Sequence, residues 1–200
     1  MGKLRLAVFV SGRGSNLRAI VESEKLKDCV ETVYVVSDKP DCKAFEYANL
    51  QGIKTLTVGR QGHGFEELAD MFESAGIGLI VLAGFLKLVP AGFVKRFEHR
   101  IINIHPALLP KYGGKGMYGH FVHEAVFAAG DKVSGPTVHY VDSEYDRGEI
   151  IAQSPVDISA AASPDEIAAI VLREEHLLLP EVIWGLVRCG GLGFGVECGV

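Results

Sequence analysis

An asparagine and a histidine lie two residues apart in the stretch NIHPALLPKYGG, as Asn103 and His105. The apolar run RIINI leads into them, and Pro106 and Pro110 follow. Residues two apart on a strand point to the same side, so both side chains would face one site. A protonated imidazole can polarise a carbonyl oxygen, and an amide N–H can stabilise an oxyanion. The spacing predicts chemistry on a carbonyl compound; the alternative is a histidine that only caps a strand end.

A carboxylate partner would orient the histidine ring or favour its protonated form. The later loop DSEYDRGEI offers Asp142, Glu144 and Asp146. Asp146 precedes Arg147 and Gly148 at a turn before a strand, so it could project into the same cleft. Spacing alone does not choose among the three acids.

A glycine-rich turn, VSGRGSNL, follows the first apolar run and opens a helical pattern. Gly12 and Gly14 permit a tight turn, and Ser15 and Asn16 add polar side chains. Free amides at a helix N-terminus attract anions, so the turn predicts a site for the phosphate of a small substrate.

A dinucleotide-binding turn is one alternative for this segment. The GxGxxG pattern would need a third glycine where Leu17 stands, although Asp38 lies where a ribose-binding acid is expected. A tight turn without any ligand is the other alternative.

These residues need a scaffold, and the chain alternates short apolar runs with helical patterns. We expect strands at 4–10, 31–37, 53–58, 78–84 and 100–104, and helices at 15–26, 42–52 and 64–76. The first helix would be capped by Ser15 or Asn16. Such alternation predicts an α/β fold: a mainly parallel twisted sheet with helices on both faces, Rossmann-like in organisation.

The second half of the chain has a different pattern. A helix is expected at 118–130, and two strands at 135–142 and 148–158 form an antiparallel addition. A long helix over 163–188 begins with a Ser-Pro-Asp-Glu cap and contains Pro180, where a kink is expected. We expect one domain over 1–188 and a glycine-rich tail over 189–200.

Composition excludes several classes of function. The chain has 200 residues, a net charge of −5 and 48% hydrophobic residues, which argues against nucleic acid as a partner. The longest apolar run contains Lys87 and is too short to span a bilayer, and the N-terminus lacks signal-peptide features. Four scattered cysteines predict free thiols in the cytoplasm, and no histidine or cysteine grouping predicts a metal.

Five segments together carry a resemblance: SGRGSNL, VLAGF, NIHPALLPKYGG, VHYVDSEYDRGEII and EEH…LP, in this order. They resemble the folate-dependent formyltransferases to about residue 188, and Gly-Ser-Asn in the first segment points to the branch that acts on glycinamide ribonucleotide. The resemblance implies formyl transfer from 10-formyltetrahydrofolate, as cosubstrate, to the amine of that ribonucleotide in purine biosynthesis. It implies no metal, and a homodimer is one assembly to be tested.

The resemblance also implies roles for individual residues. The catalytic residues would be Asn103, His105 and Asp146. The ribonucleotide would be bound by Gly14, Ser15 and Asn16 at its phosphate and by Glu175 at its ribose. The folate would contact Leu86, Lys87, Leu88, Val89 and Asn103, with Val141 and Asp142 on the other wall. The loop after Tyr112 departs from the family's Tyr-Pro-Gly, so we expect a variant loop conformation there.

Other functions remain open at this point. A formyltetrahydrofolate hydrolase would share the Asn-His-Asp set but usually carries an N-terminal regulatory domain, whereas the first strand is expected here at about residue 4. A formyltransferase acting on initiator tRNA would carry a further C-terminal domain. A non-catalytic or nicotinamide nucleotide-binding domain would need only the glycine turn and would leave NIHP unexplained.

Overall fold

A seven-stranded sheet forms the centre of the computed structural model, which describes residues 2–188. The tail at 189–200, with Cys189 and Cys198, lies outside the described residues. The sheet order is β3-β2-β1-β4-β5-β7-β8. Its strands are β1 (Leu4–Val10), β2 (Val30–Ser37), β3 (Lys54–Thr57), β4 (Leu79–Leu82), β5 (Ile101–His105), β7 (Thr137–Tyr140) and β8 (Ile150–Gln153).

The strands from β3 to β5 pair in parallel, whereas β7 and β8 add to the β5 edge in antiparallel orientation. This arrangement confirms the predicted α/β class and the antiparallel addition. The helices are α1 (Ser15–Val21), α2 (Ala44–Leu50), α3 (Phe65–Ser74), α4 (Ala91–Arg96), α5 (His120–Ala129) and α6 (Pro164–Arg188).

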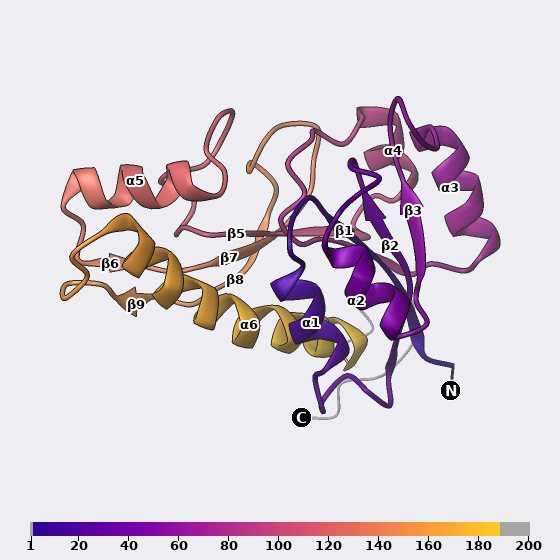
Figure 1. Ribbon diagram of the computed structural model, residues 1–200, viewed down its shortest axis with the longest axis horizontal. Helices are drawn as coiled ribbons and strands as arrows, with labels where there is room; N and C mark the ends of the chain where they lie inside the picture. The colour runs from indigo at the N-terminus through magenta and orange to yellow at the C-terminus, as the bar shows by residue number, and fades with distance from the viewer. Residues whose placement is uncertain (1, 189–200) are drawn as a thin grey trace.

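The first strand shows why helices cover both faces. Leu6, Val8 and Val10 belong to a core cluster shared with α1, α2 and α6. Phe9 points to the other face, where it packs with Phe72 of α3 and other aromatic rings. A strand that is apolar on both faces must be covered on both. Helices α1 and α6 cover one face of the sheet, and α3 and α4 cover the other (Figure 1).

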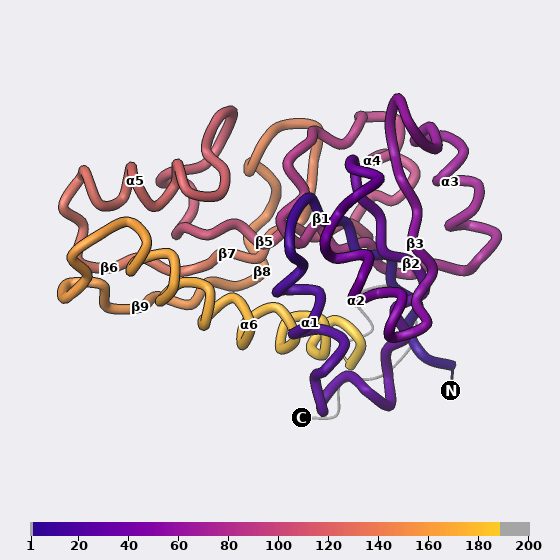
Figure 2. The backbone as a smooth tube through the Cα atoms, in the orientation of Figure 1, coloured from indigo at the N-terminus to yellow at the C-terminus, as the bar shows by residue number. Residues whose placement is uncertain are grey.

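The antiparallel end of the molecule has its own small core. Helix α5 packs against α6, and a two-stranded sheet, β6 (Val133–Ser134) with β9 (Val156–Asp157), lies beside them. In Figure 2 the loop before α5 and the loop between β7 and β8 both project to the same side of the large sheet. The first loop leaves the carboxyl end of β5, whereas the second begins beside Ile101, whose carbonyl accepts from the Val141 amide.

Several local expectations were wrong. Helix α1 ends at Val21, not near residue 26, because the chain turns there and returns Leu26 to the core at 2% exposure. Its N-cap is Gly14, and neither Ser15 nor Asn16 caps it. Helix α4 and strand β6 were not predicted, and the strand expected over 148–158 divides into β8 and β9, which belong to different sheets. The long helix is confirmed as α6, with Pro180 inside it.

The strand order reverses beside β1, because the chain runs from β1 to β2 in one direction and later adds β4 on the other side. Open α/β sheets bind ligands at this switch point, outside the carboxyl ends of the strands. Ser11 connects the two sides there: its amide donates to the Gly84 carbonyl (3.1 Å), and its hydroxyl donates to Asp38 (2.7 Å) and accepts from the Leu86 amide (3.1 Å).

Candidate active site

The carboxyl end of β5 carries Asn103 and His105. Asn103 lies opposite His139 of β7, and His105 lies opposite Thr137. The His105 side chain is almost completely buried, at 4% exposure. Because both side chains contact Asp146, the prediction that they share one side of the strand is confirmed.

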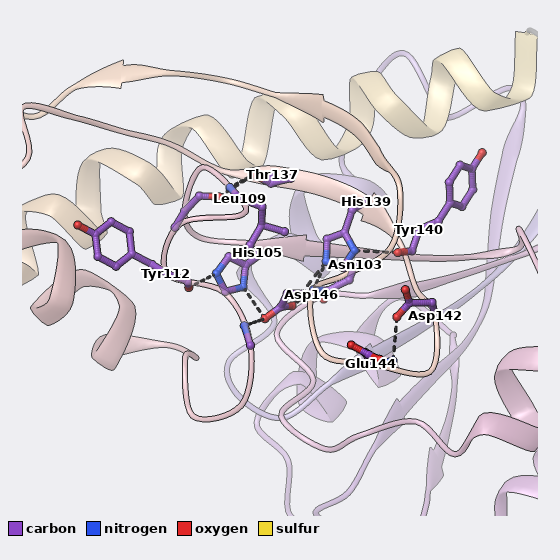
Figure 3. Close-up of polar contacts among 12 residues, drawn as sticks. Asn103, His105, Leu109, Tyr112, Thr137, His139, Tyr140, Asp142, Glu144 and Asp146 are labelled. Atoms are coloured by element: carbon purple, nitrogen blue, oxygen red, sulfur yellow. Dashed lines mark hydrogen bonds and ion pairs between the residues drawn. The ribbon is translucent and has the colours of Figure 1, made fainter.

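Asp146 is the acid that reaches the pair. Its Oδ2 lies 3.6 Å from His105 Nδ1, and its Oδ1 lies 3.5 Å from Asn103 Nδ2 (Figure 3). The backbone of Asp146 has a φ of 55°, a left-handed conformation that re-aims the side chain toward β5. Asp142 instead accepts the Glu144 amide within the loop (2.8 Å). The structure thus resolves the choice that spacing left open.

His139 of β7 also belongs to this group. Its Nδ1 donates to the Tyr140 carbonyl (2.8 Å), so in the neutral ring Nε2 is an acceptor. The Asn103 amide nitrogen lies 3.0 Å from that Nε2, and Asp146 Oδ1 lies 3.6 Å from it. His139 therefore fixes the orientation of the Asn103 side-chain amide, with the amide nitrogen toward Nε2. Only the pairing register between β5 and β7 could have revealed it.

Burial dominates the protonation of His105. It lowers the pKa of the imidazole, while Asp146 and the Tyr112 carbonyl raise it and His139 lowers it. Burial alone would also raise the pKa of Asp146, but contact with His139, the charge on His105 and the Gly114 amide outweigh it and lower that pKa. Asp146 thus favours imidazolium as expected, yet the net pKa of His105 lies below its ordinary value.

The Tyr112 carbonyl sets the tautomer of His105. It lies 2.8 Å from Nε2, which must donate a proton to it. Nδ1 therefore carries a proton only in the imidazolium form, and it is the ring atom that faces Asp146. The nitrogen whose protonation changes is thus the one beside the carboxylate.

A cavity of about 350 Å³ opens in front of this group. Its walls come from the segment after β4, the loop before α5 and the loop between β7 and β8. Every residue expected to contact folate lines it: Leu86, Lys87, Leu88, Val89, Asn103, Val141 and Asp142. Leu86 and Leu88 are 42% and 47% exposed, so two apolar side chains of the cavity wall face solvent.

The four residues expected to bind the ribonucleotide lie elsewhere. Among the described residues, the lining of this cavity does not include Gly14, Ser15, Asn16 or Glu175. The structure does bring two of them together across the sequence, because Asn16 Nδ2 donates to Glu175 Oε2 (2.6 Å). Glu175 is buried, and burial raises its pKa to about 7.

Gly14 begins α1 with a φ of 75°. A Cβ there would lie 2.7 Å from the Ala44 Cβ, so the turn needs glycine for both its conformation and its packing. The first helical bond runs from the Arg18 amide to the Gly14 carbonyl. The amides of residues 15–17 therefore lie outside the helix's own bonding, as in any first turn.

Two further observations concern residues 2–188 only. No group of three or more His, Cys, Asp or Glu side chains in this range could hold a metal ion. No helix in the same part of the chain is long and apolar enough to cross a membrane.

The fold and the Asn103–His105–Asp146 group together define an α/β protein with a cluster of polar and titratable side chains at the carboxyl end of β5. Comparison with known proteins identifies the class more closely: the formyl transferase family matches residues 4–183, and the chain belongs to that family.

Several proteins similar to this chain are named phosphoribosylglycinamide formyltransferase. A chloroplastic phosphoribosylglycinamide formyltransferase of Arabidopsis thaliana is 46% identical over 90% of this chain, and the match spans 64% of that protein. The phosphoribosylglycinamide formyltransferase of Escherichia coli K12 is 35% identical over 90% of this chain and 85% of its own length. The solved structure of the Anaplasma phagocytophilum phosphoribosylglycinamide formyltransferase is 32% identical with a TM-score of 0.85, covering 94% of this chain and 88% of that one.

The chain spans 64% of the Arabidopsis protein and 60% of a second chloroplastic phosphoribosylglycinamide formyltransferase, from Vigna unguiculata, which is somewhat less than two thirds of each.

Proposed function

We propose that this protein transfers the formyl group of 10-formyltetrahydrofolate to the amine of glycinamide ribonucleotide. One observation carries the proposal: Asn103, His105 and Asp146 converge at the edge of a cavity in a chain of the formyl transferase family. The names of the relatives that cover the chain support the choice of substrate.

The proposed reaction begins when the ribonucleotide amine attacks the formyl carbon. A bond forms between that nitrogen and the carbon, and the formyl oxygen becomes an oxyanion. Asn103 and the protonated Nδ1 of His105 stabilise this charge by donating to it. Nδ1 is the available ring atom because Nε2 is held by the Tyr112 carbonyl.

The tetrahedral intermediate then breaks the bond to N10 of the folate. The amine proton is lost and N10 gains one, a transfer that water beside Asp146 would carry. Asp146 assists by favouring imidazolium, and His139 by keeping the Asn103 amide turned toward the oxyanion. No step needs a metal.

The two substrates would approach from different directions. We assign the folate to the cavity, with the backbone of residues 86–89 on one wall and Val141 and Asp142 on the other. We assign the phosphate to Gly14, Ser15 and Asn16, and the ribose to Glu175. Carboxyl ends of parallel strands share one edge of the sheet, which supports this assignment because β1 and β5 both end there.

The competing functions are less well supported. A nicotinamide enzyme would be expected to have a third glycine where Leu17 stands, and it would leave Asn103 and His105 without a role. A hydrolase would keep the same three residues and admit water in place of the amine. It is distinguished by what the protein does with the folate alone.

The setting is also part of the proposal. We infer a single domain over 1–188 with the tail at 189–200, small-molecule partners only and a cytoplasmic location, and a homodimer is the assembly to be tested. Two of the plant relatives are named chloroplastic, which is said of those proteins. Light scattering of the full chain and cell fractionation test the last two inferences.

A crystal structure with glycinamide ribonucleotide and a non-reactive folate analogue tests the assignment. We expect the pterin beside residues 86–89, the phosphate at residues 14–16, and the amine directed toward His105. A folate analogue outside the cavity, or a phosphate held elsewhere, would contradict the proposal.

A further inference from the structure

Three consecutive residues contact both ionisable groups of the active site. The Tyr112 carbonyl accepts from His105 Nε2 (2.8 Å), and the Gly114 amide donates to Asp146 Oδ2 (2.9 Å). Between them, Gly113 packs so closely that a Cβ would lie 2.5 Å from Leu109 and 3.2 Å from Asp146. The orientation of His105 and Asp146 therefore depends on where segment 112–114 lies.

This segment has a backbone that must be held in place. Tyr112 has a φ of 56°, a left-handed conformation that is uncommon for a bulky residue, and Gly114 has a φ of 96°. Such conformations persist only where the surrounding structure enforces them. The hydrogen bond between the Tyr112 side chain and Asp131 is such a constraint.

Asp131 holds the Tyr112 side chain from outside the site. Figure 3 shows the Tyr112 ring directed away from His105, while its backbone faces the imidazole. The ring hydroxyl donates to Asp131 Oδ2 (2.8 Å), and Lys111 Nζ donates to both oxygens (2.8 and 3.0 Å). Asp131 directly follows Gly130, which ends α5, so the anchor belongs to a different element.

Of the two side chains that donate to Asp131, Tyr112 contributes more than Lys111 to holding the segment in place. Lys111 is 65% exposed, and exposed ion pairs contribute little. The hydrogen bond from a hydroxyl to a carboxylate is charge-assisted and therefore stronger than a neutral one. Lys111 and Tyr112 both lower the pKa of Asp131, which keeps the acceptor ionised.

We propose that Asp131 is a positioning residue for the active site. Through the Tyr112 hydroxyl it holds segment 112–114, so that the Tyr112 carbonyl and the Gly114 amide orient His105 and Asp146. The consequence for turnover rests on the proposed function; the consequence for the titration of His105 does not.

Two substitutions remove the anchor from opposite sides: Tyr112→Phe and Asp131→Ala. Loss of the carbonyl acceptor should lower the pKa of His105, measured by NMR titration. Small misplacement of catalytic groups is costly, so we expect kcat to fall by about 10-fold with the KM of each substrate within about twofold of wild type. The double variant should match either single variant, because both remove one interaction.

Glu24→Ala is the matched control. It removes an exposed carboxylate that pairs with Lys27 far from this loop, and both kcat and the His105 titration should stay at wild-type values. An unchanged His105 titration in folded Tyr112→Phe and Asp131→Ala would overturn the proposal, as would losses that add in the double variant. If the wild-type protein transfers no formyl group, the proposed function fails, while the NMR measurement still decides the role of Asp131.

Discussion

His105 is held at two ring atoms by chemically opposite partners. The Tyr112 carbonyl requires a proton on Nε2, and the Asp146 carboxylate favours a second proton on Nδ1. Burial opposes that proton by lowering the pKa of the ring. The residue is thus a neutral imidazole that can become a cation beside Asp146, which suits a group that must stabilise an oxyanion only in the transition state.

His105→Ala tests the residue on which the chemistry depends. We expect kcat to fall by about 10²–10³, the typical cost of losing one oxyanion donor, while calorimetry finds ribonucleotide affinity unchanged. His63→Ala is the matched control, because His63 also faces a carboxylate, Glu67, but lies outside the cavity. Wild-type turnover in a folded His105→Ala variant would remove this residue from the mechanism.

Asp146→Asn removes the negative charge beside His105 while keeping a side chain of the same size. The carboxylate raises the pKa of His105, so the variant should titrate at lower pH in an NMR experiment. The matched variant Glu144→Gln changes another acid of the same loop and should leave the titration in place. If the Glu144 variant shifted His105 and the Asp146 variant did not, the wrong acid would have been assigned.

At the scale of elements, the Asn16–Glu175 contact joins the first turn of α1 to the middle of α6. The folded protein raises the pKa of Glu175 from 4.5 to about 7. Between these values the folded state binds a proton that the unfolded state has released, so the free energy of unfolding falls as pH rises through this window. The contribution of Glu175 to stability is complete below about pH 4.5 and lost above about pH 7.

Glu175→Gln should remove that pH dependence, since glutamine stays uncharged. Denaturant unfolding from pH 5 to pH 8 should find the variant gaining about 2–3 kcal/mol relative to wild type, at about 1.4 kcal/mol per pKa unit. Glu181→Gln, on the exposed side of the same helix, should keep the wild-type trend. A wild-type trend in Glu175→Gln would mean that Glu175 is ionised in the folded protein.

The turn before α1 offers a matched pair of glycines. Gly14→Ala forces an alanine to a φ of 75° and a contact of 2.7 Å with Ala44, whereas Gly12 has nothing within 4 Å of an added Cβ. We expect Gly14→Ala to lower the free energy of unfolding by about 1–3 kcal/mol and Gly12→Ala to change it far less. Equal effects in thermal unfolding would show that the turn does not constrain Gly14.

At the scale of the whole molecule, the alternation of strands and helices was enough to predict the sheet and its antiparallel edge. Strand parity also predicted that Asn103 and His105 share a side. The family resemblance selected Asp146, but spacing could not, because its approach to β5 depends on a left-handed residue inside a loop. His139 needed the register of β7 against β5, a long-range pairing that leaves no local signal. Short elements such as α4 and β6 contain too few residues to show a periodic pattern.

The central claim is that the two substrates meet at one edge of one sheet. Anchoring the ribonucleotide at its phosphate would hold its amine against the formyl carbon, and that positioning supplies much of the rate. The direct test is to incubate the full chain with 10-formyltetrahydrofolate, with and without glycinamide ribonucleotide, and to measure formate and formylated product. The account predicts little formate from the folate alone and, once the ribonucleotide is added, one product for each folate consumed. Rapid formate release that is indifferent to the ribonucleotide, or no reaction with the folate at all, would contradict it.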